Sequence, residues 1–381
     1  MRTLIFDFEY SGHHSEYIDH LLLFLRNRSN ENNEYFFVLH PNIQTKISSL
    51  REIDDAHCLQ FMYLDPAEID IIGSYPLWKK SFMIFQLMDR YARQLKVDNA
   101  ILMSLNIFQL AIAFKNTSYK ISGILFNQFS RIDKDRHKYQ YYRKYFQTKL
   151  LLSNKSLKSV FLLNDQESVD SLNRQFKTSI FKVLIDPIPN YTPISNFDIY
   201  KEYSIDKGRK IFLHIGALDY RKGSLDILNS IQYLADDILN KIHILYVGLA
   251  KDGLKFDLIV KKQEISHLNL FTWDESFVDN EKMRSLFDQC HIVLMPYKNS
   301  EASSGILGHA ANSNKPVIAT GKGLLKELVL KYNLGSLVDD VTPENIGKAI
   351  SQAANRGIEI GDTKSFVTLR SPTAFAKKLL E

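Results

Sequence analysis

The stretch IFLHIGALDYRKGS, residues 211–224, decides how this chain folds. Its first five residues, Ile211–Ile215, form an apolar run with the length of a buried strand, and Gly216 follows at once. Gly223 then precedes a segment with helical periodicity. A strand, a glycine-containing turn and a helix, in that order, are the unit from which parallel sheets are built.

The alternation of apolar runs and helical segments extends over both halves of the chain. In the C-terminal half, further strands are expected at Ile244–Val247, Asn269–Thr272, Ile292–Met295, Pro316–Ala319 and Gly335–Val338. Helices there are expected to begin near Ser224, Asp279, Gly305, Gly323 and Pro343. The N-terminal half predicts strands at Leu4–Phe8, Tyr35–His40, Ala100–Ser104, Ile121–Phe126, Val160–Leu163 and Phe181–Ile185. The sequence therefore predicts an α/β protein with two Rossmann-like domains, each built on a parallel sheet.

The stretch Asp186–Arg209 interrupts this pattern. It contains Pro187, Pro189 and Pro193 among polar residues, and proline removes a backbone donor and favours extended chain. We expect an N-terminal domain over residues 1–190, a linker over 191–208 and a C-terminal domain over 209–370. Because open parallel sheets bind ligands at the carboxyl ends of their strands, the expected site is the cleft between the domains.

Composition places the chain among ordinary globular proteins. With 381 residues, 45% hydrophobic and 24% charged, it fits two domains. Cys58 and Cys290 are far apart and have no ligand spacing, which favours a reducing compartment. The first apolar run contains Asp7 and Glu9, unlike a secretory signal, and the run Ile101–Phe114 is too polar to span a membrane. We expect a cytoplasmic protein, or one peripheral at the inner face of the cell membrane.

Two segments at the ends of predicted strands suit a sugar nucleotide. In the first, Gly216, Arg221 and Lys222 precede a helix whose free N–H groups favour phosphate. In the second, Glu301 precedes a helix opened by Gly305. A carboxylate there accepts hydrogen bonds from sugar hydroxyls, and the first helical turn offers its N–H groups at Gly305, Ile306 and Leu307 to a diphosphate. Taken singly, the first segment also fits a solvated basic turn, and the second also fits a simple helix N-cap.

Together the two segments resemble the retaining glycosyltransferases of family 4, which have the GT-B fold. Lys222-Gly223 matches the lysine and glycine of the family's phosphate-binding loop, and Glu301 matches the first residue of its Glu-x7-Glu motif. Residues 315–319, KPVIA, match the strand that follows. The resemblance implies two Rossmann-like domains facing across a cleft and sugar transfer from a nucleotide sugar with retention. It also implies no metal ion, and a final helix over 371–381 that crosses back to the first domain.

The sequence departs from the family pattern in two places. Ala217 stands where the family has an arginine, and Arg221 is the nearest replacement. His309 stands where the family has the second glutamate, which contacts the donor ribose. A neutral imidazole offers one donor and one acceptor, so His309 touches the ribose with altered geometry or the contact comes from elsewhere. This departure keeps a non-catalytic, glycosyltransferase-like protein among the alternatives.

The resemblance implies further site residues. Phe277 and Val278 lie in the segment that matches the family's base-binding loop, where Phe277 packs near the base or is an aromatic residue of the core. Gly12-His13-His14 lies where the family has a glycine-rich loop facing the donor phosphates and the acceptor. Gly12 permits close backbone approach there, and the histidines suit phosphate or acceptor hydroxyls. The expected catalytic set is Glu301, Lys222 and His13. No metal site is expected, because adjacent histidines on one loop lack convergent partners.

Residues 115–158 are rich in cations and aromatic side chains. This segment has eleven Lys or Arg residues, with Asp133 and Asp135 as its only acids. Among them lie the aromatic residues Tyr139, Tyr141, Tyr142, Tyr145 and Phe146. Such a mixture suits an anionic membrane surface, an acidic acceptor, or a solvated face with half-buried aromatics. No motif for nucleic-acid recognition accompanies it. Asp133-Lys134-Asp135 has the Asp-x-Asp form of metal-dependent transferases of another fold, and we interpret it as chance.

The sequence thus predicts a hexosyltransferase-type enzyme that moves a sugar from a nucleotide-diphosphate sugar to a glycan or lipid-linked acceptor. Bacterial surface polysaccharide assembly is the role that the resemblance implies. The alternatives are a non-catalytic partner of a true transferase and a sugar-nucleotide epimerase, which shares the two-domain fold. A hinged small-molecule-binding module is disfavoured by the phosphate-type loops.

Overall fold

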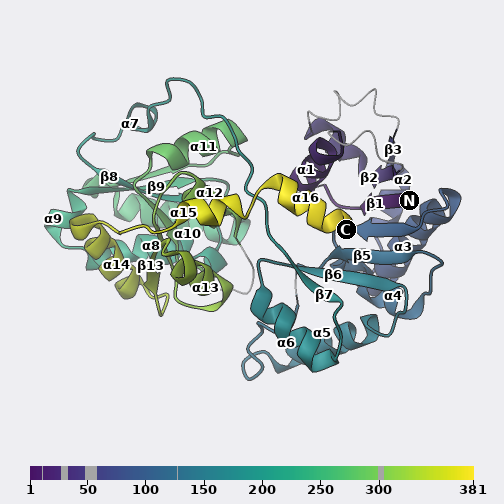
Figure 1. Cartoon of the computed structure of the whole chain (residues 1–381). Coiled ribbons are helices and arrows are strands. Elements are labelled where there is room, and N and C mark those ends of the chain that lie inside the picture. Colours follow the sequence, from purple (N-terminus) through teal and green to yellow (C-terminus); the bar gives the residue numbers. More distant parts are fainter. Residues whose placement is uncertain (11, 27–32, 48–57, 127, 299–303) are drawn as a thin grey trace. The chain divides into compact units, whose positions relative to one another are not determined.

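The computed structural model describes the chain except for residues 11, 27–32, 48–57, 127 and 299–303. The chain forms two compact units (Figure 1). One consists of Met1–Asp186 together with Pro372–Glu381, and the other is Pro187–Ser371. The chain therefore leaves the N-terminal unit, builds the C-terminal unit and returns. Among the described residues, no helix has the length and apolar character needed to cross a membrane.

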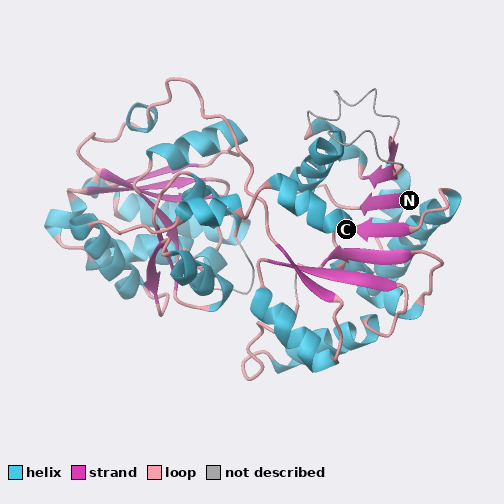
Figure 2. Cartoon of the chain, in the orientation of Figure 1, coloured by secondary structure: helices cyan, strands magenta, loops and turns pink. Residues whose placement is uncertain are grey.

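The N-terminal unit is built on a seven-stranded parallel sheet in the order β3-β2-β1-β4-β5-β6-β7 (Figure 2). The sequence order of the strands reverses between β1 and β4, which creates a switch point at their carboxyl ends. The strands are β1 Arg2–Asp7, β2 Glu34–Leu39, β3 Leu59–Tyr63, β4 Asn99–Leu102, β5 Lys120–Ile124, β6 Leu157–Leu163 and β7 Phe181–Leu184.

Helices cover both faces of this sheet, and the alternation of side chains along β1 decides which core each face joins. Leu4 and Phe6 point into one core, whereas Ile5 points into the other, between the sheet and helices α1 and α16. The helices are α1 His14–Arg26, α2 Pro66–Gly73, α3 Leu77–Gln94, α4 Gln109–Phe114, α5 Lys138–Leu151, α6 Gln166–Phe176 and α16 Pro372–Leu380; two 3₁₀ turns are η1 Pro41–Thr45 and η3 Asn106–Phe108.

The C-terminal unit has a six-stranded parallel sheet in the order β10-β9-β8-β11-β12-β13. Its strands are β8 Lys210–Ile215, β9 Ile242–Val247, β10 Phe271–Asp274, β11 Ile292–Met295, β12 Val317–Thr320 and β13 Gly335–Val338. Its helices are α7 Ile199–Glu202, α8 Ser224–Asn229, α9 Asp236–Leu239, α10 Asp252–Glu264, α11 Asn280–Gln289, α12 Gly305–Asn312, α13 Gly323–Tyr332, α14 Pro343–Arg356 and α15 Thr363–Thr368, with 3₁₀ turns η4 Tyr220–Lys222, η5 Ser230–Tyr233 and η6 Ser266–Leu268.

The predicted fold class, two parallel sheets wound by helices, is confirmed. Strand β10 begins at Phe271 rather than Asn269, because Asn269 has a φ of 46° and ends the turn η6. Strand β3 was not predicted. It is an edge strand whose last four residues are not fully buried, so its apolar pattern is weak. The stretch predicted to lack regular structure contains α7, which Asp198 caps by accepting from the N–H groups of Tyr200 and Lys201.

Helix α16 completes the core of the N-terminal unit. Phe375, Ala376 and Leu379 are buried with the apolar face of α1. The ring of Phe375 lies 4.7 Å from the ring of Tyr17, centroid to centroid. The last helix thus covers a sheet face that the first 186 residues leave incomplete.

Replacing Phe375 by alanine is expected to destabilise the N-terminal unit by about 3–5 kcal/mol, because it removes a buried ring and leaves a cavity. Hydrogen exchange of the β1 and α1 amides in increasing urea measures this effect. Thr373→Ala, at an exposed position of the same helix, is the control and should change stability by less than about 0.5 kcal/mol. Equal protection in Phe375→Ala and wild type would contradict this packing role.

Candidate functional site

The loop between β8 and α8 has a shape set by two glycines and one aspartate. Gly216 and Gly223 have φ angles of +101° and +74°, which favour glycine. Between them, the Asp219 carboxylate accepts the N–H of Lys222 at 2.7 Å and caps the turn η4. The result is a compact turn at the carboxyl end of a central strand, where ligands of parallel sheets bind.

The side chain of Lys222 folds back over this loop. A Cβ atom placed on Gly216 would lie 3.2 Å from the Lys222 Nζ and 3.9 Å from the Ile306 Cδ1. The same Nζ lies 5.8 Å from the centroid of the Tyr297 ring. The structure therefore brings Gly216 and Lys222 together with Ile306, in the first turn of α12, although about 80 residues separate them in sequence.

Positive charge predominates around the loop. Burial, followed by the neighbouring charge of Arg221, lowers the pKa of Lys222 to about 8. Burial alone would raise the pKa of Asp219, but its ion pair with Lys251, at 3.0 Å, and the Lys222 N–H hold that pKa below its usual value. Arg221 is 3.5 Å from the same carboxylate. Among the described residues, Asp219 thus has three cations near it, Arg221, Lys222 and Lys251, an arrangement that favours an anionic ligand.

A buried histidine supports the loop from beneath. His214 is fully buried, and burial lowers its pKa to about 4, so the ring is neutral. Its Nδ1 lies 2.9 Å from the Leu294 carbonyl oxygen, and its Nε2 lies 2.8 Å from the Ser224 Oγ. A neutral ring satisfies both contacts when Nδ1 donates and Nε2 accepts. The first residue of α8 is thereby fixed to the neighbouring strand β11. Sequence reasoning missed His214, although a histidine inside the apolar run Ile211–Ile215 was the available signal.

The first turn of α12 offers unpaired donors. Within the described residues, the N–H groups of Gly305 and Ile306 make no hydrogen bond to protein, whereas Leu307 donates to the Ser304 carbonyl at 3.1 Å. The side chain of Leu307 is buried in the core, so it has no surface to offer a ligand. Glu301, the predicted sugar contact, lies outside the described residues.

The other predicted residues of the C-terminal unit lie in two different environments. The half-buried ring of His309 stacks between Tyr191 and Phe287, at centroid distances of 6.0 Å and 5.6 Å. Phe277 is 86% exposed in the loop that follows β10, and Val278 beside it packs against the core. The Phe277 side chain is therefore exposed, in a loop that follows the carboxyl end of its strand as the Lys222 loop does.

Gly12 and His13 belong to the N-terminal unit, at the carboxyl end of β1. Gly12 has a φ of +66° and has open space around it. The His13 side chain is half exposed, stacks on Tyr17 at 5.7 Å and lies 3.7 Å from Glu16. The neighbouring Glu16 carboxylate raises the pKa of His13, although burial opposes it.

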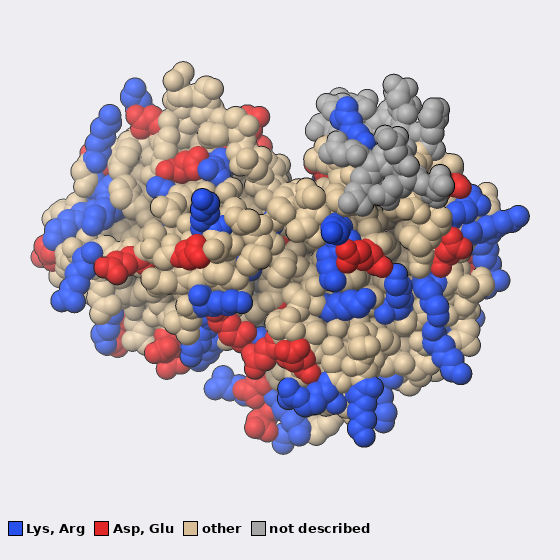
Figure 3. All heavy atoms as spheres, in the orientation of Figure 1, with Lys and Arg blue, Asp and Glu red and all other residues tan. Residues whose placement is uncertain are grey.

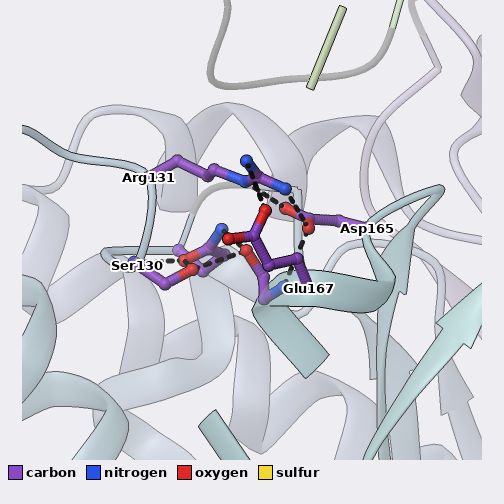
Figure 4. Close-up of polar contacts among 6 residues, drawn as sticks. Ser130, Arg131, Asp165 and Glu167 are labelled. Atoms are coloured by element: carbon purple, nitrogen blue, oxygen red, sulfur yellow. Dashed lines mark hydrogen bonds and ion pairs between the residues drawn. The ribbon is translucent and has the colours of Figure 1, made fainter. Parts of the chain in front are cut away.

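A polar cluster that sequence reasoning missed lies where β5 and β6 end (Figure 4). Arg131 donates to both oxygens of the buried Asp165 carboxylate, at 2.7 Å and 3.0 Å. Asp165 also accepts the N–H of Ser168 and so caps α6. Arg131 further pairs with Glu167 at 3.3 Å. Arg131, one of the cations of the basic segment, therefore links the loop after β5 to the start of α6.

No group of three or more His, Cys, Asp or Glu side chains is arranged to hold a metal ion within the described ranges. The Asp133 carboxylate, from the Asp-x-Asp sequence, accepts the backbone N–H groups of Asp135 and Arg136 and forms a local turn.

The described residues thus form two units with one parallel sheet each, and in the second unit a cationic loop lies beside the first turn of α12. Residues 196–360, most of the C-terminal unit, match the family model described as glycosyl transferases group 1. The C-terminal unit is therefore similar to the glycosyl transferases group 1 family over these residues. No curated protein sequence matches the chain.

Solved structures share this fold over the whole chain. One is WaaG, a glycosyltransferase involved in lipopolysaccharide biosynthesis, with 12% identity, a TM-score of 0.63, and coverage of 100% of this chain and 94% of that one. Another is Anabaena Alr3699/HepE in complex with UDP-glucose, with 14% identity, a TM-score of 0.65, and coverage of 100% and 98%. A putative UDP-N-acetylglucosamine 2-epimerase from Listeria monocytogenes has 10% identity, a TM-score of 0.58, and coverage of 99% and 93%. The chain thus has the GT-B fold.

The glycine at the end of the Lys222 loop allows a direct stability test. A Cβ atom on Gly223 would lie 2.4 Å from the Pro296 carbonyl oxygen, at a positive φ. Gly223→Ala should therefore destabilise the C-terminal unit by at least about 2 kcal/mol in urea unfolding. Gly253→Ala, where a Cβ meets nothing within 4 Å, should be neutral or slightly stabilising because it lies in a helix. Similar stability of the two variants would show that the loop tolerates another shape.

Proposed function

We propose that this protein is a glycosyltransferase that moves a sugar from a nucleotide-diphosphate sugar to a glycan or lipid-linked acceptor. The observation that carries the proposal is the Lys222 ammonium, folded over Gly216 beside Ile306, in a region that matches the group 1 glycosyl transferase model. Within the described residues, the N–H groups of Gly305 and Ile306 make no hydrogen bond to protein. The neighbouring HepE structure contains UDP-glucose. As the family resemblance implies, we propose hexosyl transfer with retention of the anomeric configuration and without a metal ion.

The charge that develops on the departing nucleoside diphosphate is the main barrier to such a transfer. Lys222, Arg221 and the first turn of α12 present fixed positive charge and donors, and such groups stabilise a transition state best when they are preorganised. Glu301 would orient the donor sugar through its hydroxyls. Phe277 and Val278 would hold the base, and His309 would reach the ribose with the edge of its stacked ring. His13 would contact donor phosphate or acceptor from the N-terminal unit.

The two alternatives predict different turnover. A sugar-nucleotide epimerase would convert a nucleotide sugar with no acceptor present, whereas a transferase requires the acceptor for product formation. A non-catalytic partner would bind nucleotides weakly and would co-purify with an active transferase. We favour the transferase because residues 196–360 match the group 1 glycosyl transferase model, and because the Lys222 loop, held by Asp219 and His214, suits an anionic donor.

Isothermal titration with UDP, GDP, ADP and CDP in the presence of a chelator tests the donor site. Wild type should bind one diphosphate, and Lys222→Ala should weaken binding by at least about tenfold, since it removes a partly desolvated charge contact. Because the pKa of Lys222 is about 8, its charge is present below that pH. Affinity should therefore fall as the pH rises through about 8, and Lys222→Arg should retain affinity at higher pH.

Lys348→Ala, which removes an exposed cation of α14, is the matched control and should bind like wild type. If Lys222→Ala bound as tightly as the control at every pH, the loop would not be the diphosphate site. Binding that disappeared with the chelator would contradict metal independence.

We also propose that the protein is cytoplasmic and peripheral at the inner face of a bacterial membrane, where surface polysaccharides are assembled. The support lies on α5. Its exposed side includes Tyr139, Tyr142, Phe146 and Leu150, spaced three or four residues apart, so they form one stripe. Residues 136–164 contain no Asp or Glu. On the face seen in Figure 3, Lys and Arg are interspersed with Asp and Glu. A cationic helix with an exposed aromatic stripe suits anionic headgroups.

Sedimentation with vesicles of phosphatidylcholine, with or without phosphatidylglycerol, tests this surface. Binding should require the anionic lipid, and Phe146→Ser combined with Arg143→Gln should reduce the bound fraction at least about fivefold, since both apolar and charge contacts are lost. Tyr233→Ser, at a 50% exposed aromatic position of the C-terminal unit, should bind like wild type. Equal loss in both variants, or equal binding to both vesicles, would exclude α5 as the contact.

A further inference from the structure

Asp7 and His14 form a hydrogen-bonded pair at the carboxyl end of β1. The His14 Nδ1 lies 2.7 Å and 3.0 Å from the two carboxylate oxygens of Asp7. Asp7 is 1% exposed, and one of its oxygens also accepts the N–H of Glu9 at 3.1 Å. His14 is the first residue of α1, and its side chain is 15% exposed. Its second nitrogen, Nε2, has no hydrogen-bond partner within the described residues.

Neighbouring histidines lack this arrangement. His13 is half exposed and faces Glu16. His20 is buried with neither nitrogen hydrogen-bonded, and the Nδ1 of His40 accepts the N–H of Asn42. Of these four, only His14 combines a buried carboxylate behind Nδ1 with an accessible Nε2. A carboxylate in that position fixes the tautomer and stabilises the charged ring when Nε2 takes a proton.

The pair also lies where the N-terminal sheet is expected to receive a ligand. β1 is paired with β2 on one side and β4 on the other, and the strand order reverses between β1 and β4. Parallel sheets bind ligands outside the carboxyl ends of the strands at such a switch point. The ring of Phe126, after β5, packs 5.9 Å from the His14 ring, so the imidazole is held on an apolar neighbour.

We propose that His14 is the acid–base residue of the acceptor side: its Nε2 removes the proton from the attacking hydroxyl of the acceptor, and Asp7 positions the ring. In this step the hydroxyl oxygen forms its bond to the anomeric carbon. The bond from that carbon to the diphosphate oxygen breaks, and its electron pair stays on the diphosphate. The proton moves to Nε2 and later returns to solvent. The hydroxyl loses its proton whichever face of the sugar is attacked, so this step rests on the proposed transfer but not on its stereochemistry.

The charged groups around His14 give this step a defined pH dependence. Burial works against the imidazolium, and His13 opposes it, but the hydrogen bond and charge of Asp7, together with Glu9, outweigh them and raise the pKa of His14. Only the neutral ring accepts a proton, so transfer should rise with pH through a midpoint above 6.5. Removing the Asp7 charge lowers that pKa, which moves the acidic limb of the profile to lower pH.

The test compares His14→Gln and Asp7→Asn with wild type, using kcat for transfer against pH and the Kd of the nucleoside diphosphate. His14→Gln should lower kcat by about 100-fold or more, the usual size of a general-base contribution, and leave the diphosphate Kd within about twofold. Asp7→Asn should lower kcat and move the acidic limb of the pH profile to lower pH. His267→Gln, an exposed histidine of the C-terminal unit, should match wild type.

Nitrogen-detected NMR of the histidine rings in wild type adds a reading that does not depend on variant folding. His14 should be protonated on Nδ1 while Nε2 titrates with the midpoint of the kinetic limb. The inference is overturned if His14→Gln keeps kcat within about threefold, if the Asp7→Asn limb does not move, or if Nε2 does not titrate. If one of these outcomes is found while the wild-type protein binds diphosphate and transfers sugar, only the role of His14 is wrong. If the wild-type protein does neither, the proposed function and the role of His14 are both wrong.

Discussion

The carboxylate of Asp219 is the constraint on which the proposed donor site depends. It is buried, it accepts the N–H of Lys222 at 2.7 Å, and it pairs with Lys251 at 3.0 Å. Without it, Arg221, Lys222 and Lys251 would repel one another, and the turn η4 would lose its cap. The Lys222 ammonium is directed back over Gly216 and forms no ion pair with any of the described residues. A single acid therefore both shapes the loop and preserves its excess positive charge.

The loop between β8 and α8 is held by hydrogen bonds from buried core residues as well as by the charged groups at its surface. The His214 ring links Ser224 at the start of α8 to the Leu294 carbonyl on β11. Tyr246, from β9, donates its hydroxyl to the Ser224 carbonyl. Residues of three strands thus hold the start of α8, so the loop that we propose binds phosphate has a fixed shape. Such preorganisation is what makes electrostatic stabilisation effective in a low-dielectric site.

Much of the fold could be predicted from sequence because apolar runs and helical repeats are local patterns. Ile211–Ile215 and Gly335–Val338 were recognised by this periodicity, whereas the edge strand Leu59–Tyr63 was not, since its side chains are only partly buried. The parts of the site set by tertiary contacts could not be read this way. The approach of Lys222 to Gly216 depends on left-handed backbone, and the pairing of Arg131 with Asp165 joins residues 34 positions apart. The stacking of His309 between Tyr191 and Phe287 likewise has no local signal.

The return of α16 to the N-terminal unit has a consequence for the order in which the protein matures. During synthesis, β1 and α1 leave the ribosome first, yet the aromatic and leucine side chains that α16 covers, Tyr17 among them, stay uncovered until the whole C-terminal unit has been translated. The C-terminal unit is continuous in sequence and can fold as soon as it emerges. The N-terminal unit is therefore completed only after the C-terminal unit has been made, and until then the part of its apolar face that α16 covers stays exposed.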